Sequence, residues 1–215
     1  GTPWIKIYYV KYEKALENAK ELSKTRIFAG NLFSKNVCEE LRFLDMPSVR
    51  FAVDIKDCPL CENGIDKVEF LLSANVGEDL KPLSKIASGG ELSRIMLAIK
   101  SVLSEKDGIS TLVFDEIDTG VSGSAAQKIA VKLKQVSHSH QVICVTHLAQ
   151  IAAYADEHLF ISKSEHDGQT YTELKSLYFD ERKSELARIM GGFEVTSTML
   201  ESAEQMLLSA NKVDK

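Results

Sequence analysis

The sequence lacks the features of a secreted or membrane-inserted protein. Its cysteines number only 4 and are too scattered for a disulfide framework: Cys38, Cys58, Cys61 and Cys144. No apolar run reaches the roughly 18 residues that a membrane-spanning helix needs, and the chain does not open with a secretory leader. We therefore expect a protein of the reducing cytoplasm with no membrane partner.

Glycine and proline are also scarce, at 12 and 4 of 215 residues, which excludes collagenous and low-complexity chains. The hydrophobic share of 44% fits a folded protein with one large domain, or with one domain and an appendage. The formal net charge is −5, and basic residues outnumber acidic ones only over 1–48. Because nucleic acids are bound mainly through Lys and Arg, we expect any DNA contact of this piece to be local or to lie elsewhere.

Residues 12–44 contain an apolar stripe at helical spacing, which predicts one long helix that Met46-Pro47 ends. Its length favours a coiled-coil strand that enters a domain, although a long helix lying on its own domain also fits the imperfect heptads. We accordingly expect a coiled-coil strand over residues 1–48 and a globular lobe over 49–215. Residues 1–10 suggest no role.

After the proline, apolar and polar residues alternate over 49–55 and 68–72, which predicts an antiparallel hairpin with a loop over 57–66. A polar stretch then leads into a helix over 90–103. The remaining pattern predicts strands over 111–114, 141–145, 158–161 and 171–177, and helices over 124–136, 148–154, 184–190 and 197–209. The first two of these strands are apolar without alternation, so we expect an α/β lobe with a mainly parallel sheet covered on both faces.

Ser88-Gly89-Gly90-Glu91 stand where the polar stretch enters the helix. The two glycines let backbone N–H groups approach an anion, the serine hydroxyl adds a donor, and the helix N-terminus has a favourable dipole. These four residues are therefore candidates for binding a phosphate group. They also fit a plain helix-entry turn, where Ser-Gly-Gly is common.

Two carboxylates follow the apolar run 111–114. Asp115 and Glu116 stand at the carboxyl end of the predicted strand, where open α/β sheets bind ligands. Adjacent strand residues point to opposite sides, so Asp115 could hold Mg²⁺ while Glu116 polarises an attacking water. Asp118 continues the loop and could line the same crevice. The alternative is a solvated strand end.

His147 follows the next apolar run, 142–145, in a position that parallels Asp115 on the neighbouring strand. An imidazole there can form a hydrogen bond with a γ-phosphate or with the attacking water. A lone histidine at a strand end is also often structural, and this second interpretation stays open.

The order and spacing of these three groups resemble the signature, Walker B and switch-histidine motifs of ABC-type ATPases. Further stretches resemble the RecN family of SMC-like bacterial DNA-repair proteins: residues 70–78, 81–83, 87–98, 114–123, 146–153 and 185–192. The resemblance covers about residues 12–210. It implies an α/β fold that is the C-terminal lobe of an ABC/SMC-type ATPase head, preceded by a returning coiled-coil strand.

The resemblance also implies a function in DNA double-strand break repair and recombination, with ATP and Mg²⁺ as cofactors. Residues 88–91 of one head would grip the ATP bound to a second head, so a homodimer is implied. Asp115 would hold Mg²⁺ in the chain's own head, and Asp118 would line the cofactor site there. Glu116 and His147 would be the catalytic residues. DNA is the implied partner of the complete protein, and the implied location is the nucleoid.

One departure from the family pattern is the absence of a G-x-x-x-x-G-K-[ST] phosphate loop. The family carries this loop in its N-terminal half, so we expect that half as a partner, and we expect the present residues alone to hydrolyse no ATP. An ABC-transporter motor is disfavoured, because its phosphate loop would precede the signature. A non-enzymatic coiled-coil association module is disfavoured by the intact Asp115, Glu116 and His147.

Cys58-Pro59-Leu60-Cys61 requires a separate interpretation. One C-x-x-C supplies half of a tetrahedral zinc site, and a second chain would have to supply the rest. Zinc-hook repair ATPases have such a motif at the coiled-coil tip, whereas this one falls in the expected hairpin loop. We therefore favour a reduced turn over a metal site.

Overall fold

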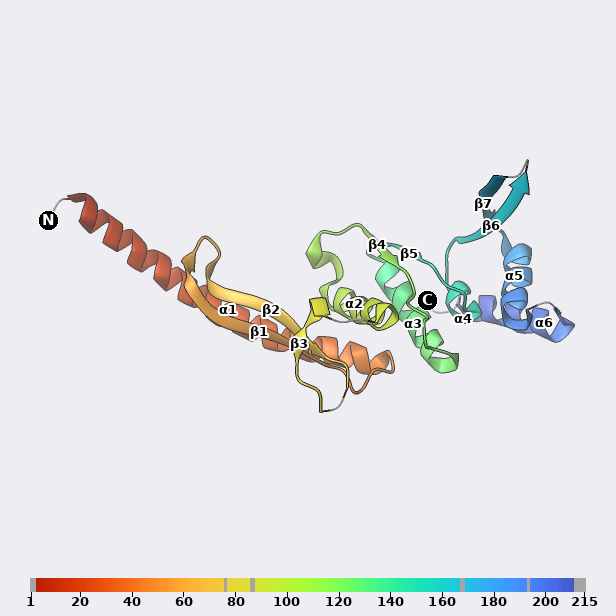
Figure 1. Ribbon diagram of the computed structural model, residues 1–215, viewed down its shortest axis with the longest axis horizontal. Helices are drawn as coiled ribbons and strands as arrows, with labels where there is room; N and C mark the ends of the chain where they lie inside the picture. The colour runs from red at the N-terminus through yellow and green to blue at the C-terminus, as the bar shows by residue number, and fades with distance from the viewer. Residues whose placement is uncertain (1–2, 76, 86–87, 167–168, 193, 211–215) are drawn as a thin grey trace. The chain divides into compact units, whose positions relative to one another are not determined.

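The computed structural model describes residues 3–75, 77–85, 88–166, 169–192 and 194–210 (Figure 1). The chain forms two compact units, residues 1–87 and 88–215. The boundary expected after residue 48 does not coincide with this division, because the first helix and the hairpin pack on each other. Residues 1–2, 76, 86–87, 167–168, 193 and 211–215 lie outside the described ones, and they include Val76 and Ala87 of the RecN-like stretches.

Helix α1 (Pro3–Phe43) begins earlier than predicted. Pro3 can open it, since a proline at the first helical position costs no helical hydrogen bond. The helix also ends before Met46-Pro47. Asp45 adopts a φ of 59°, and the Met46 N–H donates to the Leu41 carbonyl at 2.9 Å. This is a Schellman cap, so a left-handed residue ends the helix and the proline follows it.

Strands β1 (Arg50–Cys61) and β2 (Gly64–Ser73) form the predicted antiparallel hairpin, and β3 (Lys81–Pro82) extends the sheet in the order β1-β2-β3. The expected loop over 57–66 was wrong, because most of it is strand. Its side chains show no regular alternation of polar and apolar residues that would indicate a strand, yet the backbone pairing continues through most of it. A short 3₁₀ helix, η1 (Leu83–Lys85), follows β3.

The core of the first unit lies between α1 and the hairpin. Phe33 of α1 packs against Phe51 and Phe70 of the two strands, with ring centroids 5.4 to 5.8 Å apart. At Gly30 a Cβ would lie 3.2 Å from Val53 Cγ1, so the absence of a side chain lets α1 approach β1 closely. The N-terminal turns of α1 extend beyond the hairpin (Figure 1). Phe28, farther along the helix, is 73% exposed.

The second unit begins with elements that match the predicted ranges to within two residues. They are α2 (Gly89–Leu103), β4 (Thr111–Phe114), α3 (Gly123–Ser137) and β5 (Gln141–Cys144). A short 3₁₀ helix that was not predicted, η2 (Ser104–Asp107), follows α2. Strands β4 and β5 pair in parallel with Phe114 opposite Cys144. The strand-helix-strand pattern is therefore confirmed.

The expectation of two covered sheet faces was wrong for this chain. On β4, Leu112 and Phe114 are buried, whereas Val113 is 65% exposed, and Ile143 of β5 is 46% exposed. The apolar runs do indicate a sheet with two apolar faces, but the described residues cover only one of them. The predicted parallel pairing is confirmed for β4 and β5, whereas the two C-terminal strands pair with each other in antiparallel fashion.

The C-terminal elements are α4 (Ala149–Ala152), β6 (His158–His166), β7 (Gln169–Leu177), α5 (Phe179–Gly191) and α6 (Ser197–Ala210). Helix α5 begins before the predicted residue 184, because Glu181 accepts the Tyr178 N–H at 3.1 Å and caps its start. The expected cap of α6 is confirmed at Thr196, whose hydroxyl accepts the Met199 N–H. Small residues let α4, α5 and α6 pack closely: Ala149, Ala152, Ala153, Ala187 and Ala203. None of the described helices is both long and apolar enough to cross a bilayer.

Candidate functional site

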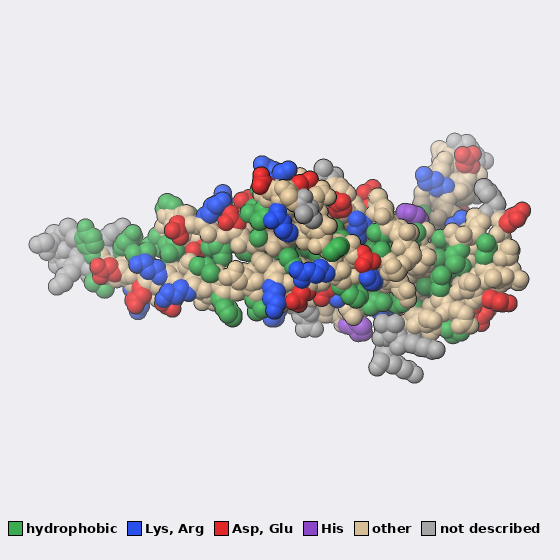
Figure 2. Space-filling model, turned by 90° about the horizontal axis from the view of Figure 1, so that it is seen from below, with side chains coloured by type: hydrophobic (Ala, Val, Ile, Leu, Met, Phe, Trp, Pro, Cys, Tyr) green, Lys and Arg blue, Asp and Glu red, His purple; other side chains and the backbone are tan. Residues whose placement is uncertain are grey.

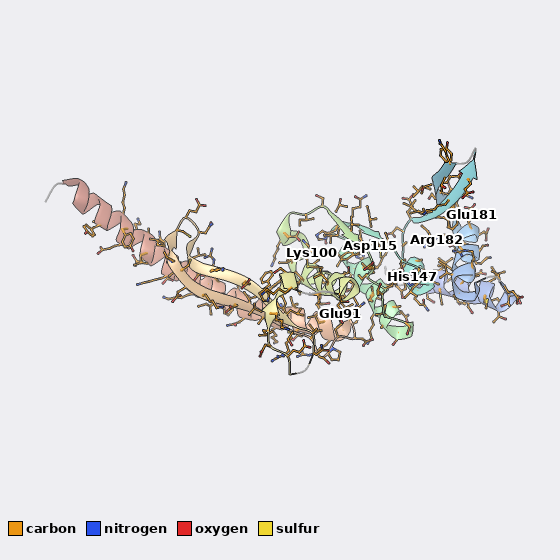
Figure 3. All side chains as sticks on the ribbon, in the orientation of Figure 1. Glu91, Lys100, Asp115, His147, Glu181 and Arg182 are labelled. Atoms are coloured by element: carbon orange, nitrogen blue, oxygen red, sulfur yellow. The ribbon has the colours of Figure 1, made fainter. Side chains whose placement is uncertain are left out.

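The carboxyl ends of β4 and β5 lie side by side because the two strands are parallel neighbours. The Val145 N–H donates to the Phe114 carbonyl at 2.9 Å, just beyond the last paired residues. Asp115 and His147, both labelled in Figure 3, follow these two strand ends and therefore leave the sheet at the same edge. The structure thus brings together two of the groups that the sequence predicted to meet.

Ser88 caps the helix that follows it. Its hydroxyl accepts the Glu91 N–H at 3.4 Å, and its carbonyl accepts the Leu92 N–H at 3.0 Å. Ser88 and Gly89 are exposed at the N-terminus of α2, while Gly90 is buried. This geometry is that of a helix-entry turn, and it also leaves an exposed helix N-terminus of the kind that attracts anions.

The two glycines lie against the loop that follows β4. A Cβ on Gly90 would lie 2.9 Å from Thr119 Cβ and 3.0 Å from the Glu116 carbonyl oxygen. A Cβ on Gly89 would lie 2.5 Å from Glu116 Oε2. Gly90 is therefore required for backbone packing, whereas Gly89 is opposed only by the end of one flexible side chain.

Two further residues of α2 fasten the same loop, and the sequence interpretation missed them. Ser93 Oγ donates to the Asp115 carbonyl at 2.7 Å, and Arg94 Nη1 donates to the carbonyls of Ile117 (3.2 Å) and Thr119 (2.9 Å). Burial lowers the pKa of the Arg94 guanidinium from its ordinary value. The sequence did contain one signal for this contact: Arg94 falls on the otherwise apolar face of the helix, where a charged side chain needs hydrogen-bond partners.

Glu116 has the unusual backbone of the site. Its φ is 57°, a left-handed conformation that is costly for a side chain of this kind. Asp115 supports the turn, since its Oδ1 accepts the Glu116 N–H at 2.9 Å. Both residues are exposed, so their carboxylates are accessible from solvent.

Asp118 was expected to line the crevice and bind cofactor, but the structure buries it. Its Oδ2 accepts the Thr146 hydroxyl at 2.6 Å and the His147 N–H at 2.9 Å, and lies 3.2 Å from His147 Nδ1. These contacts tie the loop after β4 to the loop after β5. Asp118 therefore orients His147, whose side chain remains 76% exposed.

We expect Asp118→Asn to lower the free energy of unfolding of the second unit by about 1 kcal/mol, since an amide oxygen accepts both hydrogen bonds without the charge that strengthens them. Urea unfolding followed by circular dichroism measures this change. Asp180→Asn is the matched control, because the Asp180 side chain is 90% exposed and an exposed ion pair contributes little. Equal effects of the two substitutions would contradict this role for Asp118.

Cys144 lies at the end of β5 beside these acidic residues. Burial raises the pKa of its thiol to about 12, and the carboxylates of Asp118 and Asp115 add to the shift. The thiol is therefore protonated at neutral pH and is a poor nucleophile.

Other hollows of the second unit lie away from this edge. One of about 90 Å³ is lined by Lys100, Lys132 and His140, and one of about 510 Å³ by Gln150, Tyr154 and other residues of α3, α4 and α6. In the described ranges no three His, Cys, Asp or Glu side chains are grouped so that they could hold a metal ion. A metal ion bound by Asp115 would therefore need its other ligands from groups other than the described His, Cys, Asp and Glu side chains.

The sequence is similar to curated bacterial proteins named DNA repair protein RecN. It is 45% identical over 185 residues to that of Halalkalibacterium halodurans and 52% identical over 154 residues to that of Bacillus subtilis, covering 84% and 72% of this chain. The chain belongs to the RecN family. It corresponds to a C-terminal part of RecN and spans only 33% and 27% of these two relatives. No protein-family model matches the chain.

Solved structures confirm the fold class. The Smc head domain with a coiled coil and joint from Pyrococcus yayanosii has a TM-score of 0.57 at 22% identity, over 93% of this chain and 34% of that one. The Smc head domain with an extended coiled coil from Pyrococcus furiosus, bound to the C-terminal domain of ScpA, has a TM-score of 0.50 at 25% identity, over 75% of this chain and 38% of that one. The RecN-family chain therefore has the α/β fold of an SMC-type head lobe with a coiled-coil helix.

Proposed function

We propose that the chain supplies the signature, Walker B and switch-histidine elements of an ATPase head in a RecN-family DNA-repair protein. The observation that carries this proposal is the bridge by Asp118, whose buried carboxylate holds His147 at the sheet edge where Asp115 and Glu116 emerge. The names of the relatives support DNA repair over a transporter motor. A location in the cytoplasm, on the nucleoid, follows from this function.

The residues fit a nucleotide with Mg²⁺. In phosphoryl transfer, a magnesium ion takes most of its ligands from phosphates and water, so one exposed carboxylate such as Asp115 is a sufficient protein contribution. ATP with Mg²⁺ would supply the phosphoanhydride to be cleaved and the charge neutralisation of its oxygens. Glu116 would accept a proton from the attacking water, and His147 would donate a hydrogen bond toward the γ-phosphate.

The exposed start of α2 would act on a second head. Ser88 and Gly89 would present a hydroxyl and backbone N–H groups to the nucleotide held by the partner copy, assisted by Gly90, Glu91 and the helix dipole. Glu116 now lies against Gly89, so its carboxylate must turn toward its own nucleotide before it can act as a base. Its exposure allows this rotation. Hydrolysis would remove the phosphate that both heads share and release the pair.

DNA binding by the complete protein would depend on surfaces that this chain only partly supplies. On the face drawn in Figure 2, basic and acidic side chains are interspersed. The chain as a whole has a net charge of −5, and phosphate binding requires basic residues. DNA contacts would therefore lie on other parts of the protein or on surfaces formed by its assembly.

The proposal is tested by complementation. We expect the 215-residue chain alone to release no phosphate from ATP above background, because it carries no phosphate-loop lysine. Addition of the N-terminal region of a RecN-family protein, which would carry that loop, should restore turnover in a coupled phosphate-release assay. The same region with its phosphate-loop lysine replaced by Ala is the control. Turnover by the chain alone would contradict the proposal.

A further inference from the structure

The tip of the β1-β2 hairpin carries two thiols that the proposed ATPase does not use. The antiparallel register runs regularly to Asp57 opposite Asp66 and resumes at Cys61 opposite Gly64. Between these pairs, residues 58–60 stand opposite Ile65 alone, so the strand bulges. The bulge tolerates Pro59, which cannot donate to the ladder, and it gathers Cys58 and Cys61.

The two thiols interact with each other. The neighbouring Cys61 thiol contributes to the raised pKa of the Cys58 thiol, and Cys61 Sγ donates to the Gly64 carbonyl at 3.4 Å. Both are unpaired thiols rather than a disulfide. They differ in access, because Cys61 is exposed and Cys58 is partly buried.

The tip is held in place from α1. Arg26 Nη1 donates to the Asn63 carbonyl at 2.8 Å and to Asp66 Oδ2 at 3.0 Å, and Ser23 Oγ donates to Asp66 Oδ1 at 2.7 Å. Gly64 adopts a φ of 102°, which suits glycine, and thereby allows the tight turn beside Arg26. The bulge that holds the thiols is therefore fixed at both of its ends.

We propose that Cys58 and Cys61 form a reversible redox site that exchanges with small disulfides of the glutathione class and closes an intrachain disulfide. The Cys61 thiolate attacks the small disulfide, forms a mixed disulfide and expels one thiolate. Cys58 then loses its proton and attacks the Cys61 sulfur, which expels the second thiolate. In sum, two protein thiols are oxidised, one small disulfide is reduced, and two small thiols are released.

The assignment of the two roles follows from their surroundings. Partial burial raises the pKa of the Cys58 thiol, and the neighbouring Cys61 and Asp66 add to the shift, which outweighs the opposing effect of Arg26. A less ionised and less accessible thiol attacks external disulfides slowly. Cys61, the exposed thiol, is therefore the attacking group, and Cys58, within the bulge that Cys61 closes, resolves the mixed disulfide.

The test uses the reduced 215-residue chain in glutathione buffers of increasing oxidised fraction. After acid quenching and alkylation, the intact mass should show that two thiols can no longer be alkylated and that no glutathione is attached to the protein. Dithiothreitol should restore both thiols. In Cys58→Ser the mixed disulfide on Cys61 should accumulate, whereas Cys61→Ser should react more than about tenfold more slowly. Cys38→Ser and Cys144→Ser are matched controls and should behave as the unmodified chain.

Three results would overturn the redox assignment. The first is reaction of Cys61→Ser at the unmodified rate. The second is retention of all thiols in fully oxidised buffer. The third is zinc that copurifies at one ion per two chains and disappears in Cys58→Ser, since this would indicate a tetrathiolate site shared between copies.

Discussion

Replacement of Glu116 by Gln in the complete RecN-family protein is expected to reduce ATP turnover by about 10² to 10³-fold. Glutamine keeps the size of the side chain and its ability to form hydrogen bonds, but it cannot accept the proton of the attacking water. The shared phosphate would then stay in place, so the ATP-bound pair of heads should persist. Phosphate release measures the first effect, and light scattering with ATP measures the second.

Glu201→Gln is the matched control for this substitution, because Glu201 is an exposed residue of α6 away from the sheet edge. It should leave turnover and pairing unchanged. Unchanged turnover in Glu116→Gln would exclude Glu116 as the base. Loss of both turnover and pairing would indicate instead that Glu116 is needed to bind the nucleotide.

Alanine at Gly90 and at Gly89 should separate packing from function at the start of α2. At Gly90 the new Cβ would lie 2.9 Å from Thr119 Cβ and 3.0 Å from the Glu116 carbonyl oxygen. Relief of this clash would require the backbone of the loop after β4 to move. We expect Gly90→Ala to lower the free energy of unfolding by about 1 to 3 kcal/mol and to abolish turnover of the complete protein.

At Gly89 the new Cβ would meet only Glu116 Oε2, at 2.5 Å, and this exposed side chain can rotate away. Gly89→Ala should therefore unfold at the same urea concentration as the unmodified chain. In the complete protein it should weaken ATP-dependent pairing by about tenfold or more, because the methyl group obstructs approach of phosphate to the helix N-terminus. Equal loss of stability in the two variants would contradict this separation.

The sequence predicted the elements best where a local pattern was complete. Strand β4 occupies the predicted residues 111–114, because an uninterrupted apolar run is visible in the sequence itself. The hairpin was underestimated because residues 57–66 include Pro59 and Gly64, which are typical of loops, and show no regular alternation of polar and apolar side chains. Their strand structure depends on backbone pairing with the opposite strand and on the anchor that Arg26 provides from α1.

The location of the candidate site was also predictable, because parallel neighbouring strands end at one edge and their carboxyl-terminal residues must meet there. The hydrogen-bond partners of individual side chains were not predictable. Arg94 and Asp118 form their hydrogen bonds with residues 23 to 29 positions away in the chain. No local pattern encodes such contacts, and an acidic residue in a loop looks the same whether it faces solvent or the interior.

The sequence by itself therefore determined the order of the elements, the RecN-family motifs and the edge at which they gather, since these depend on periodicity and on residues close together in the chain. Only the tertiary structure decided that Asp118 is buried beneath His147, that Gly90 packs on the loop after β4, and that one face of the parallel strands stays exposed. These features arise from burial and hydrogen bonding between distant segments, whose energies exist only once the segments have come together.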